Sequence, residues 1–216
     1  MIDQILELFT AHHLRILDVV GAVLGLVYIL LEYRASIYLW LVSIIMPLVD
    51  MWLYFSAGLY ADFGMAIYYA LAAIYGYIAW KWGFKKKGSD KKEPPQIGHI
   101  PGRQALYATF AFLLVWLALY EILTRFTNST VPMTDSFTSA LSIIALWALS
   151  RKYVEQWLMW LVVDVISCVL YIYKGIPFKA GLYGLYVIIA ILGYFKWCRM
   201  MKDKVSRSQG VKKLRS

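Results

Sequence analysis

Long apolar blocks follow one another along most of the chain and are separated by short polar connectors. Each block holds roughly 20 mostly apolar residues, the length that an α-helix needs to cross the hydrocarbon core of a bilayer. The pattern therefore predicts an all-α integral membrane protein with seven transmembrane helices. The predicted helices cover residues 15–33, 36–57, 60–82, 104–126, 134–150, 154–173 and 178–198.

The chain contains an internal repeat. Residues 17–82 fall on residues 134–199 without a gap when they are shifted by 117 positions, with 15 identities in 66 positions. Each repeat holds three predicted helices, and the helix between them restores the orientation, so we expect two parallel three-helix repeats joined by a central helix. Transporters commonly use such repeats and bind their substrate near the bilayer midplane, at the interface of the repeats. The identities include Asp18/Asp135, Arg34/Arg151, Trp40/Trp157, Gly64/Gly181, Gly76/Gly193 and Trp80/Trp197.

Polar residues gather in segments outside the helices. Pro and Gly keep the central connector from becoming a helix, and we expect the basic tail to be mobile. The expected organisation is an N-terminal interfacial segment (1–14), repeat one (15–82), a basic cytoplasmic connector (83–103), a linker helix (104–126), repeat two (134–199) and a basic cytoplasmic tail (200–216).

Basic residues test the helix count, because cytoplasmic loops carry an excess of Lys and Arg. With seven helices, 18 of the 22 Lys and Arg residues fall on one side of the membrane and four on the other. The bias predicts an N-terminus outside and a cytoplasmic C-terminus. It also explains the net charge of +9, so we expect a lipid bilayer as the surrounding partner and no nucleic acid.

Composition narrows the function further. Hydrophobic residues make up 61% of the chain and charged residues 16%, against about 25% charged in soluble domains. No predicted helix holds a Ser/His cluster, a catalytic pair of acids or a set of metal ligands, and His12, His13 and His99 are isolated. We therefore expect no enzyme, no metal and no cofactor.

Two acidic residues lie inside predicted helices. Asp164 stands mid-helix among Leu, Val and Ile residues, and Asp50 stands between Val49 and Met51. A carboxylate at membrane depth is costly and is by default a functional candidate. We predict that Asp164 and Asp50 bind a cationic ligand ring or an amine; a hydrogen bond within the bundle or a protonated acid is the structural alternative.

Aromatic residues share the helix face of Asp164. Trp157 and Trp160 are spaced i, i+3, and Trp160 and Asp164 are spaced i, i+4, so the three can line one wall. Aromatic faces attract cations, and Trp does so best. Anchoring at the membrane interface or packing is the alternative for each aromatic residue. The remaining aromatic candidates for substrate binding are Trp40, Tyr69 and Tyr186.

Smaller residues predict how the helices meet. The glycine pairs Gly64/Gly181 and Gly76/Gly193 are expected to permit close helix contact. Asp18 and Asp135 are expected to cap helices or to bond between them.

Residues 150–160, Ser-Arg-Lys-Tyr-Val-Glu-Gln-Trp-Leu-Met-Trp, followed by Asp-Val-Ile-Ser at 164–167, resemble the signature of the PnuC family of vitamin transporters. The resemblance covers most of the chain and implies a SWEET-like 3+1+3 fold in the bacterial inner membrane. It implies facilitated diffusion of a vitamin precursor, usually nicotinamide riboside and in some relatives thiamine or riboflavin. A cytoplasmic kinase then traps the imported substrate, and neither ATP nor an ion gradient is implied.

The chain departs from the nicotinamide riboside pattern of that family. Amide side chains of the pattern are replaced by Ala66, Ala73 and Leu192, and an Asn by Asp164. From the family resemblance and the acidic residues within the helices, the expected function is import of a cationic vitamin precursor of the nicotinamide riboside type by alternating access. A thiamine transporter of the same family and a substrate-binding membrane subunit of a larger complex are the alternatives, and a homo-oligomer is left open.

Overall fold

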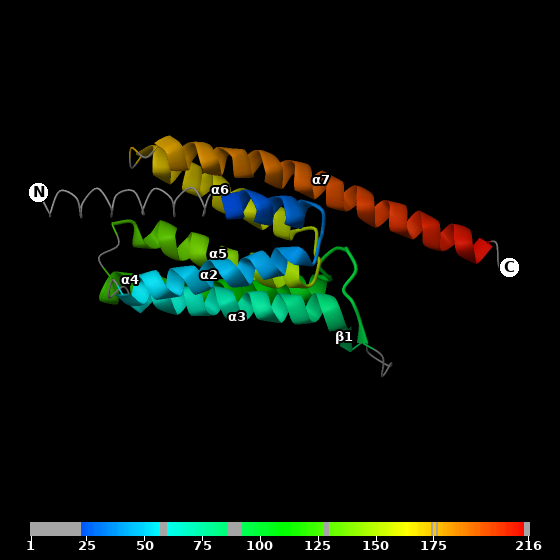
Figure 1. The fold of residues 1–216 in the computed structure, drawn as a ribbon, viewed down its shortest axis with the longest axis horizontal. Helices are drawn as coiled ribbons and strands as arrows, with labels where there is room; N and C mark the ends of the chain where they lie inside the picture. Colours follow the sequence, from blue (N-terminus) through cyan, green and yellow to red (C-terminus); the bar gives the residue numbers. More distant parts are fainter. Residues whose placement is uncertain are drawn as a thin grey trace, which may run out of the picture. The chain divides into compact units, whose positions relative to one another are not determined.

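The computed structural model describes residues 23–56, 60–85, 92–127, 130–173, 175 and 177–213, and these are almost entirely helical (Figure 1). The all-α prediction with seven helices is confirmed in this part of the chain, where the predicted boundaries agree within two residues except at the first and last helices. The helices are Val23–Tyr33, α2 Tyr38–Ser56, α3 Tyr60–Trp82, α4 Gly102–Phe126, α5 Pro132–Ser150, α6 Gln156–Tyr173 and α7 Pro177–Lys213, with two-residue strands β1 Phe84–Lys85 and β2 Lys92–Glu93. The predicted start of the first helix and the 1–14 segment lie outside the described residues.

The last helix corrects one prediction. We expected it to end near residue 198 and to give way to a mobile tail, yet α7 continues to Lys213. The residues after 198 include Met, Lys, Arg and Gln, which favour helix, and contain no Pro. The change from apolar to polar residues marks where a helix leaves the bilayer and does not by itself end the helix.

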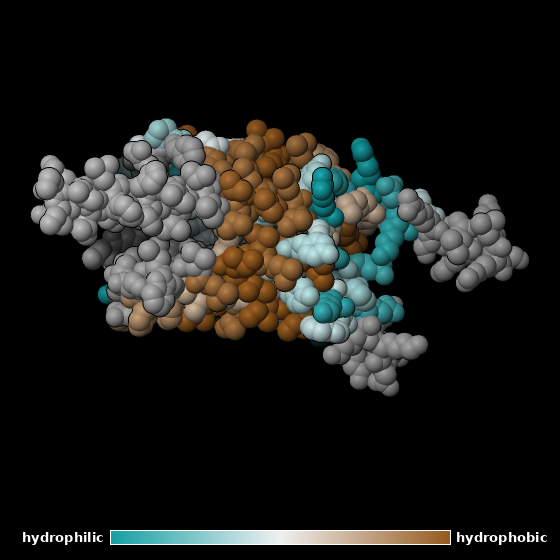
Figure 2. Space-filling view, viewed as in Figure 1, coloured by the Kyte–Doolittle hydropathy of each residue, from teal (hydrophilic) through white to brown (hydrophobic). Residues whose placement is uncertain are grey.

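Apolar residues cover the middle of the helices (Figure 2). Three described helical stretches are long and apolar enough to cross a membrane: Gly102–Phe126, Gln156–Tyr173 and Lys179–Lys204. In α4 no residue is buried within the protein, and its exposed side chains include Leu106, Phe110 and Leu117. An apolar helix with an apolar outer surface is expected where lipid, not water, surrounds it.

The chain divides into two compact units, residues 1–78 and 79–216, with the boundary inside α3. In the second unit α5 packs against both α4 and α6, and α6 packs against α7. The thiol of Cys168 on α6 donates to the carbonyl of Ala180 on α7 at 3.3 Å. In the first unit α2 packs against α3, as the contact of Trp40 with Gly76 records.

The turn after the first helix of each repeat has the same backbone conformation. Ala35 and Lys152, which are repeat equivalents, both have a positive φ, 50° and 58°. In each turn the next N–H donates to the carbonyl five residues back, which is the Schellman ending of a helix. The two bonds are Ser36 to Leu31 and Tyr153 to Ala148, both 2.9 Å. The duplication seen in the sequence is thus repeated in local structure.

Each repeat also places a Trp against a Gly of its own third helix. The fully buried ring of Trp40 on α2 lies against Gly76 on α3, and that of Trp157 on α6 lies against Gly193 on α7. A Cβ at Gly193 would lie 2.7 Å from three ring atoms of Trp157. The predicted close contact at this glycine pair is confirmed. The same prediction for Gly64 and Gly181 is wrong in the described part of the chain, where a Cβ at either would meet nothing within 4 Å.

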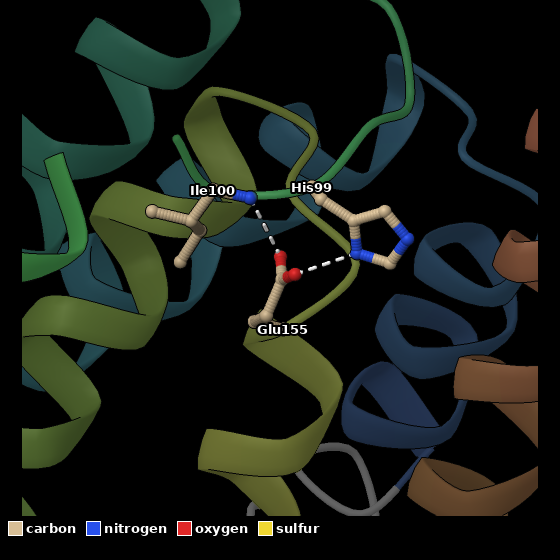
Figure 3. A network of polar contacts seen from close by, with 3 residues as sticks. All are labelled: His99, Ile100 and Glu155. Atoms are coloured by element: carbon tan, nitrogen blue, oxygen red, sulfur yellow. Dashed lines mark hydrogen bonds and ion pairs between the residues drawn. The ribbon is translucent and has the colours of Figure 1, made fainter. Parts of the chain in front are cut away.

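The connector is held against the start of α6 by Glu155 (Figure 3). One carboxylate oxygen of Glu155 accepts the backbone N–H of Ile100 at 3.1 Å, and the other pairs with Nδ1 of His99 at 2.7 Å. Gly98 forms a parallel bridge beside Tyr153, whose hydroxyl donates to Gln104 at 2.7 Å. His99, predicted to be isolated, is therefore part of the contact that fixes the connector.

The end of α3 and the hairpin contact the turn between α5 and α6. The indole N–H of Trp80 donates to the carbonyls of Leu149 and Ser150 at 3.3 and 3.2 Å. The guanidinium of Arg151 lies 3.8 Å from the ring centre of Phe84, and Nζ of Lys152 lies 4.0 Å from that of Trp80. Cation–π attraction and hydrogen bonds thus hold the turn from which α6 starts.

A methyl group at the Trp-contacting glycine should destabilise the protein. Gly193→Ala inserts a Cβ into the ring of Trp157, and such overpacking costs typically about 1–3 kcal/mol. Gly181→Ala is the matched control on the same helix. No described atom lies within 4 Å of a Cβ there, and replacing Gly by Ala stabilises a helix by about 1 kcal/mol at most. Thermal unfolding of the two purified variants in detergent should therefore move in opposite directions. Equal unfolding midpoints would contradict the packing described.

Removing the Glu155 carboxylate should free the connector. In Glu155→Ala the N–H of Ile100 loses its acceptor, and we expect its amide hydrogen to exchange roughly tenfold faster, as for loss of a charge-assisted hydrogen bond. Hydrogen-exchange mass spectrometry of the peptide that spans 98–104 measures this. Glu121→Ala removes an exposed carboxylate that pairs with Arg125 on the same helix and should leave that peptide unchanged.

Candidate functional site

Buried polar side chains mark the interior of the helix bundle. Among the described residues the buried polar side chains are Glu32, Ser136, Ser142, Ser150, Gln156 and Asp164. The three serines donate to carbonyls of their own helix at 2.7–3.0 Å, and Glu32 bonds the hydroxyl of Tyr28. The two that remain, Gln156 and Asp164, both belong to α6, and this helix is therefore the candidate wall of a binding site.

Asp164 lies where the sequence predicted it, in the middle of α6 and only 6% exposed. Its flanking residue Val163 is buried as well. The hydroxyl-bearing Tyr186 of α7 lies close enough to interact electrostatically with the carboxylate. The structure thus brings together two of the predicted site residues from the second and third helices of repeat two.

The two predicted Trp residues of α6 have different surroundings. Trp157 is held between Gly193 and Trp197, whose ring meets it edge-on with centroids 5.8 Å apart. Trp160 is partly exposed, and among the described residues its buried indole N–H has no hydrogen-bond partner. Packing therefore accounts for the ring of Trp157, while Trp160 presents a free donor one turn from Asp164.

Aromatic residues continue from Tyr186 along α7. Its ring meets Tyr183 edge-on at 5.8 Å, and Tyr183 stacks on Tyr171 of α6 at 5.3 Å. Nζ of Lys179 lies 5.4 Å from the ring centre of Tyr171. This aromatic row connects the surroundings of Asp164 to the α6–α7 turn.

The remaining predicted site residues belong to the first unit. Trp40 is buried against Gly76, as Trp157 is against Gly193. Tyr69 is partly exposed on α3, where its ring meets Tyr68 edge-on at 5.6 Å. Asp50 lies within α2, but its side chain is outside the described part of the structure.

The positions that depart from the nicotinamide riboside pattern separate into two groups. Ala66 and Ala73 are buried on α3, so small apolar side chains fill interior positions there. Leu192 is 52% exposed on α7 within the described structure. Two of the three departures from the amide pattern thus lie at buried positions of α3, and the third lies at an exposed position of α7.

Asp135 corrects a smaller expectation. It lies in the first turn of α5, but the N-cap of that helix is Val131, and no side-chain hydrogen bond caps it. The expectation that Asp135 caps a helix is therefore wrong, and the alternative, a bond between helices, stays a prediction. The negative charge still stands near the positive end of the helix dipole. Its repeat partner Asp18 lies outside the described residues.

Positive charge gathers at the turn that precedes α6. Burial lowers the pKa of the Lys152 ammonium from its ordinary value, and the nearby positive charge of Lys204 lowers it further. Among the described residues no group of three His, Cys, Asp or Glu side chains could hold a metal ion. The arrangement offers hydrogen bonds, an aromatic face and one carboxylate, which can bind an organic ligand.

Sequence reasoning missed Gln156. Its side chain is fully buried, and neither atom of its carboxamide has a hydrogen-bond partner in the described structure. The repeat alignment contained a signal, because the equivalent residue of repeat one is Leu39.

Comparison with known proteins places the chain among vitamin transporters. It is 26% identical to the nicotinamide riboside transporter PnuC of Escherichia coli over 216 residues, which covers 89% of each chain. It is 29% identical to the riboflavin/roseoflavin transporter RibM of Streptomyces davaonensis, covering 83% of each chain. The crystal structure of the vitamin B3 transporter PnuC superposes with a TM-score of 0.65 at 22% identity, covering 85% of this chain and 81% of that one.

These likenesses extend over nearly the whole chain. The structural one supports the fold, and the relatives by sequence are transporters, in agreement with the expectation that this chain is not an enzyme. Residues 15–199 match the family described as nicotinamide mononucleotide transporter. The chain therefore belongs to the nicotinamide mononucleotide transporter family of multi-pass membrane transporters.

Proposed function

We propose that the chain imports a cationic vitamin precursor of the nicotinamide riboside type by facilitated diffusion. The observation that carries the proposal is the buried carboxylate of Asp164 in the middle of α6. An acid at membrane depth that has no basic partner among the described residues is costly to keep ionised. A ligand with a fixed positive ring would supply the missing charge.

The neighbours of Asp164 suit a flat cationic ring. Trp160 lies one turn away on the same face, and the face of its indole attracts cations. Tyr186 of α7 lies close to the carboxylate and its hydroxyl can donate to a ligand oxygen or to the acid itself. The ring would stack on Trp160 with its charge toward Asp164.

Transport would use alternating access between the two three-helix bundles. Duplicated bundles with a shared backbone design, as in the two equivalent turns, can rock against each other around a fixed site. The resemblance to the PnuC family implies that the concentration gradient of the substrate drives import and that cytoplasmic phosphorylation by a kinase traps the product. The sequence agrees with this, since it contains no phosphate-binding Gly-rich loop. The protein would lie in the bacterial inner membrane with its N-terminus outside.

Two other vitamins are candidates for the same site. Thiamine also carries a fixed positive ring, and its aminopyrimidine can donate to the carboxylate of Asp164. Riboflavin is suggested by the 29% identity to RibM, although its ring has no positive charge to match the acid. Binding of the three compounds to one purified protein separates them.

Neutralising Asp164 should weaken binding of a cationic substrate. We expect Asp164→Asn to raise the Kd of nicotinamide riboside at least about tenfold, because loss of a desolvated charge pairing costs more than 1.4 kcal/mol. Isothermal titration calorimetry on the detergent-purified protein measures the Kd. Asp203→Asn, at an exposed acid of α7, is the control and should bind as the wild type does.

The result also chooses between substrates. Tight thiamine binding that the Asn variant loses would make the chain a thiamine carrier. Nicotinamide riboside binding that survives the substitution would contradict the role of Asp164 and leave the family function in place.

The proposed orientation can be tested by labelling. In a Cys168→Ala, Cys198→Ala background, Thr10→Cys should react with a membrane-impermeant maleimide on spheroplasts. Ser216→Cys should react only after the membrane is permeabilised, since the side with 18 basic residues is retained in the cytoplasm. The reverse pattern would contradict the orientation.

A further inference from the structure

Gln156 is the buried polar residue that neither the fold nor the proposed function uses. Its side chain is 0% exposed, and both its Oε1 and its Nε2 lack hydrogen-bond partners among the described residues. A buried amide that is left unpaired destabilises a protein, and such groups in native structures call for an explanation. A ligand that pairs with the amide would supply one.

The backbone on both sides of Gln156 is fixed. The preceding Glu155 bonds to the connector through Ile100 and His99 (Figure 3). The following Trp157 is seated against Gly193. The carboxamide therefore projects from a rigid element, which is the arrangement expected of a group that recognises a ligand.

Gln156 also shares its helix face with the proposed site. Residues 156, 160 and 164 are spaced i, i+4, i+8, so an amide, an indole N–H and a carboxylate form one stripe along α6. The stripe spans about 12 Å of the helix axis at 1.5 Å per residue. Gln156 and Trp160 both contribute donors that have no partner within the described protein.

The stripe is absent from the other repeat. The equivalents of Gln156, Trp160 and Asp164 in α2 are Leu39, Ser43 and Pro47, and the hydroxyl of Ser43 donates to the carbonyl of Leu39 at 2.9 Å. The Trp–Gly contact and the turn, by contrast, occur in both repeats. The two packing features are thus duplicated, whereas the polar stripe occurs in the second repeat and is replaced at the equivalent positions of the first.

We propose that Gln156 is a specificity-determining residue whose carboxamide pairs with an amide-type edge of the transported heterocycle. Such an edge carries one hydrogen-bond donor beside one acceptor, as in the carboxamide of a nicotinamide ring, and Oε1 and Nε2 of Gln156 match it in two hydrogen bonds. The inference rests on the proposed transport function and deepens it. Trp160 and Asp164 would bind the ring, and the carboxamide of Gln156 would hydrogen-bond to the amide-type substituent of the ring.

The test replaces Gln156 by the residue of the other repeat. Gln156→Leu should raise the Kd of nicotinamide riboside at least about tenfold, because a buried hydrogen-bonding edge of the ligand is then left unpaired. The same change replaces two unpartnered polar atoms by apolar ones in a side chain of similar volume. The unfolding temperature of the ligand-free variant should therefore equal or exceed that of the wild type. Calorimetry and thermal unfolding on the same sample measure both.

A second glutamine supplies the matched control. Gln104 accepts the hydroxyl of Tyr153 at 2.7 Å, so Gln104→Leu should lower the unfolding temperature and leave the Kd unchanged. The isosteric Gln156→Glu, which loses the donor, should weaken binding even if the Leu variant does not fold. Nicotinic acid riboside, whose carboxylate also lacks the donor, should bind the wild type at least tenfold more weakly than the amide.

The outcomes separate the two proposals. If the wild type binds nicotinamide riboside and both Gln156 variants bind it with the same Kd, the role of Gln156 is overturned and transport stands. If the wild type binds neither nicotinamide riboside, thiamine nor riboflavin, the proposed function fails and the role of Gln156 fails with it.

Discussion

The indole ring of Trp157 fits beside α7 only because residue 193 has no side chain, since a Cβ there would lie 2.7 Å from the ring. This contact, and its counterpart between Trp40 and Gly76, joins the second and third helices of each repeat. A buried Trp provides a large contact area, and Gly lets the two backbones approach. Through it α6 is held against α7, and Asp164 is brought near Tyr186.

The two repeats share their packing and turn features but differ in the polar side chains of their second helices. Equivalent positions share the Trp–Gly contact, the positive φ at Ala35 and Lys152 and the bonds of the turn. They do not share the polar stripe on α6, which stands where α2 carries apolar or internally bonded residues. The same helix packing therefore tolerates a polar stripe on α6 and apolar or internally bonded residues at the equivalent positions of α2. One repeat can then carry the groups that bind a ligand.

The long apolar blocks and the distribution of basic residues predicted the helices, because a chain that crosses lipid must satisfy its backbone hydrogen bonds internally. They could not predict the end of α7, because a change from apolar to polar residues does not stop a helix when the polar residues themselves favour helix. The glycine pairs 64/181 and 76/193 look alike in sequence, and only the position of a Trp on the neighbouring helix distinguishes them. Asp164 was predictable from its apolar neighbours, whereas Gln156 lies beside a turn, where polar residues are ordinary.

The most direct test of the account is a structure of the purified protein with the most tightly bound of its candidate vitamins. The account predicts a ligand ring beside Trp160, its charge toward Asp164 and its amide-type edge hydrogen-bonded to the carboxamide of Gln156. A ligand bound elsewhere, with the polar atoms of α6 still unpaired, would contradict it.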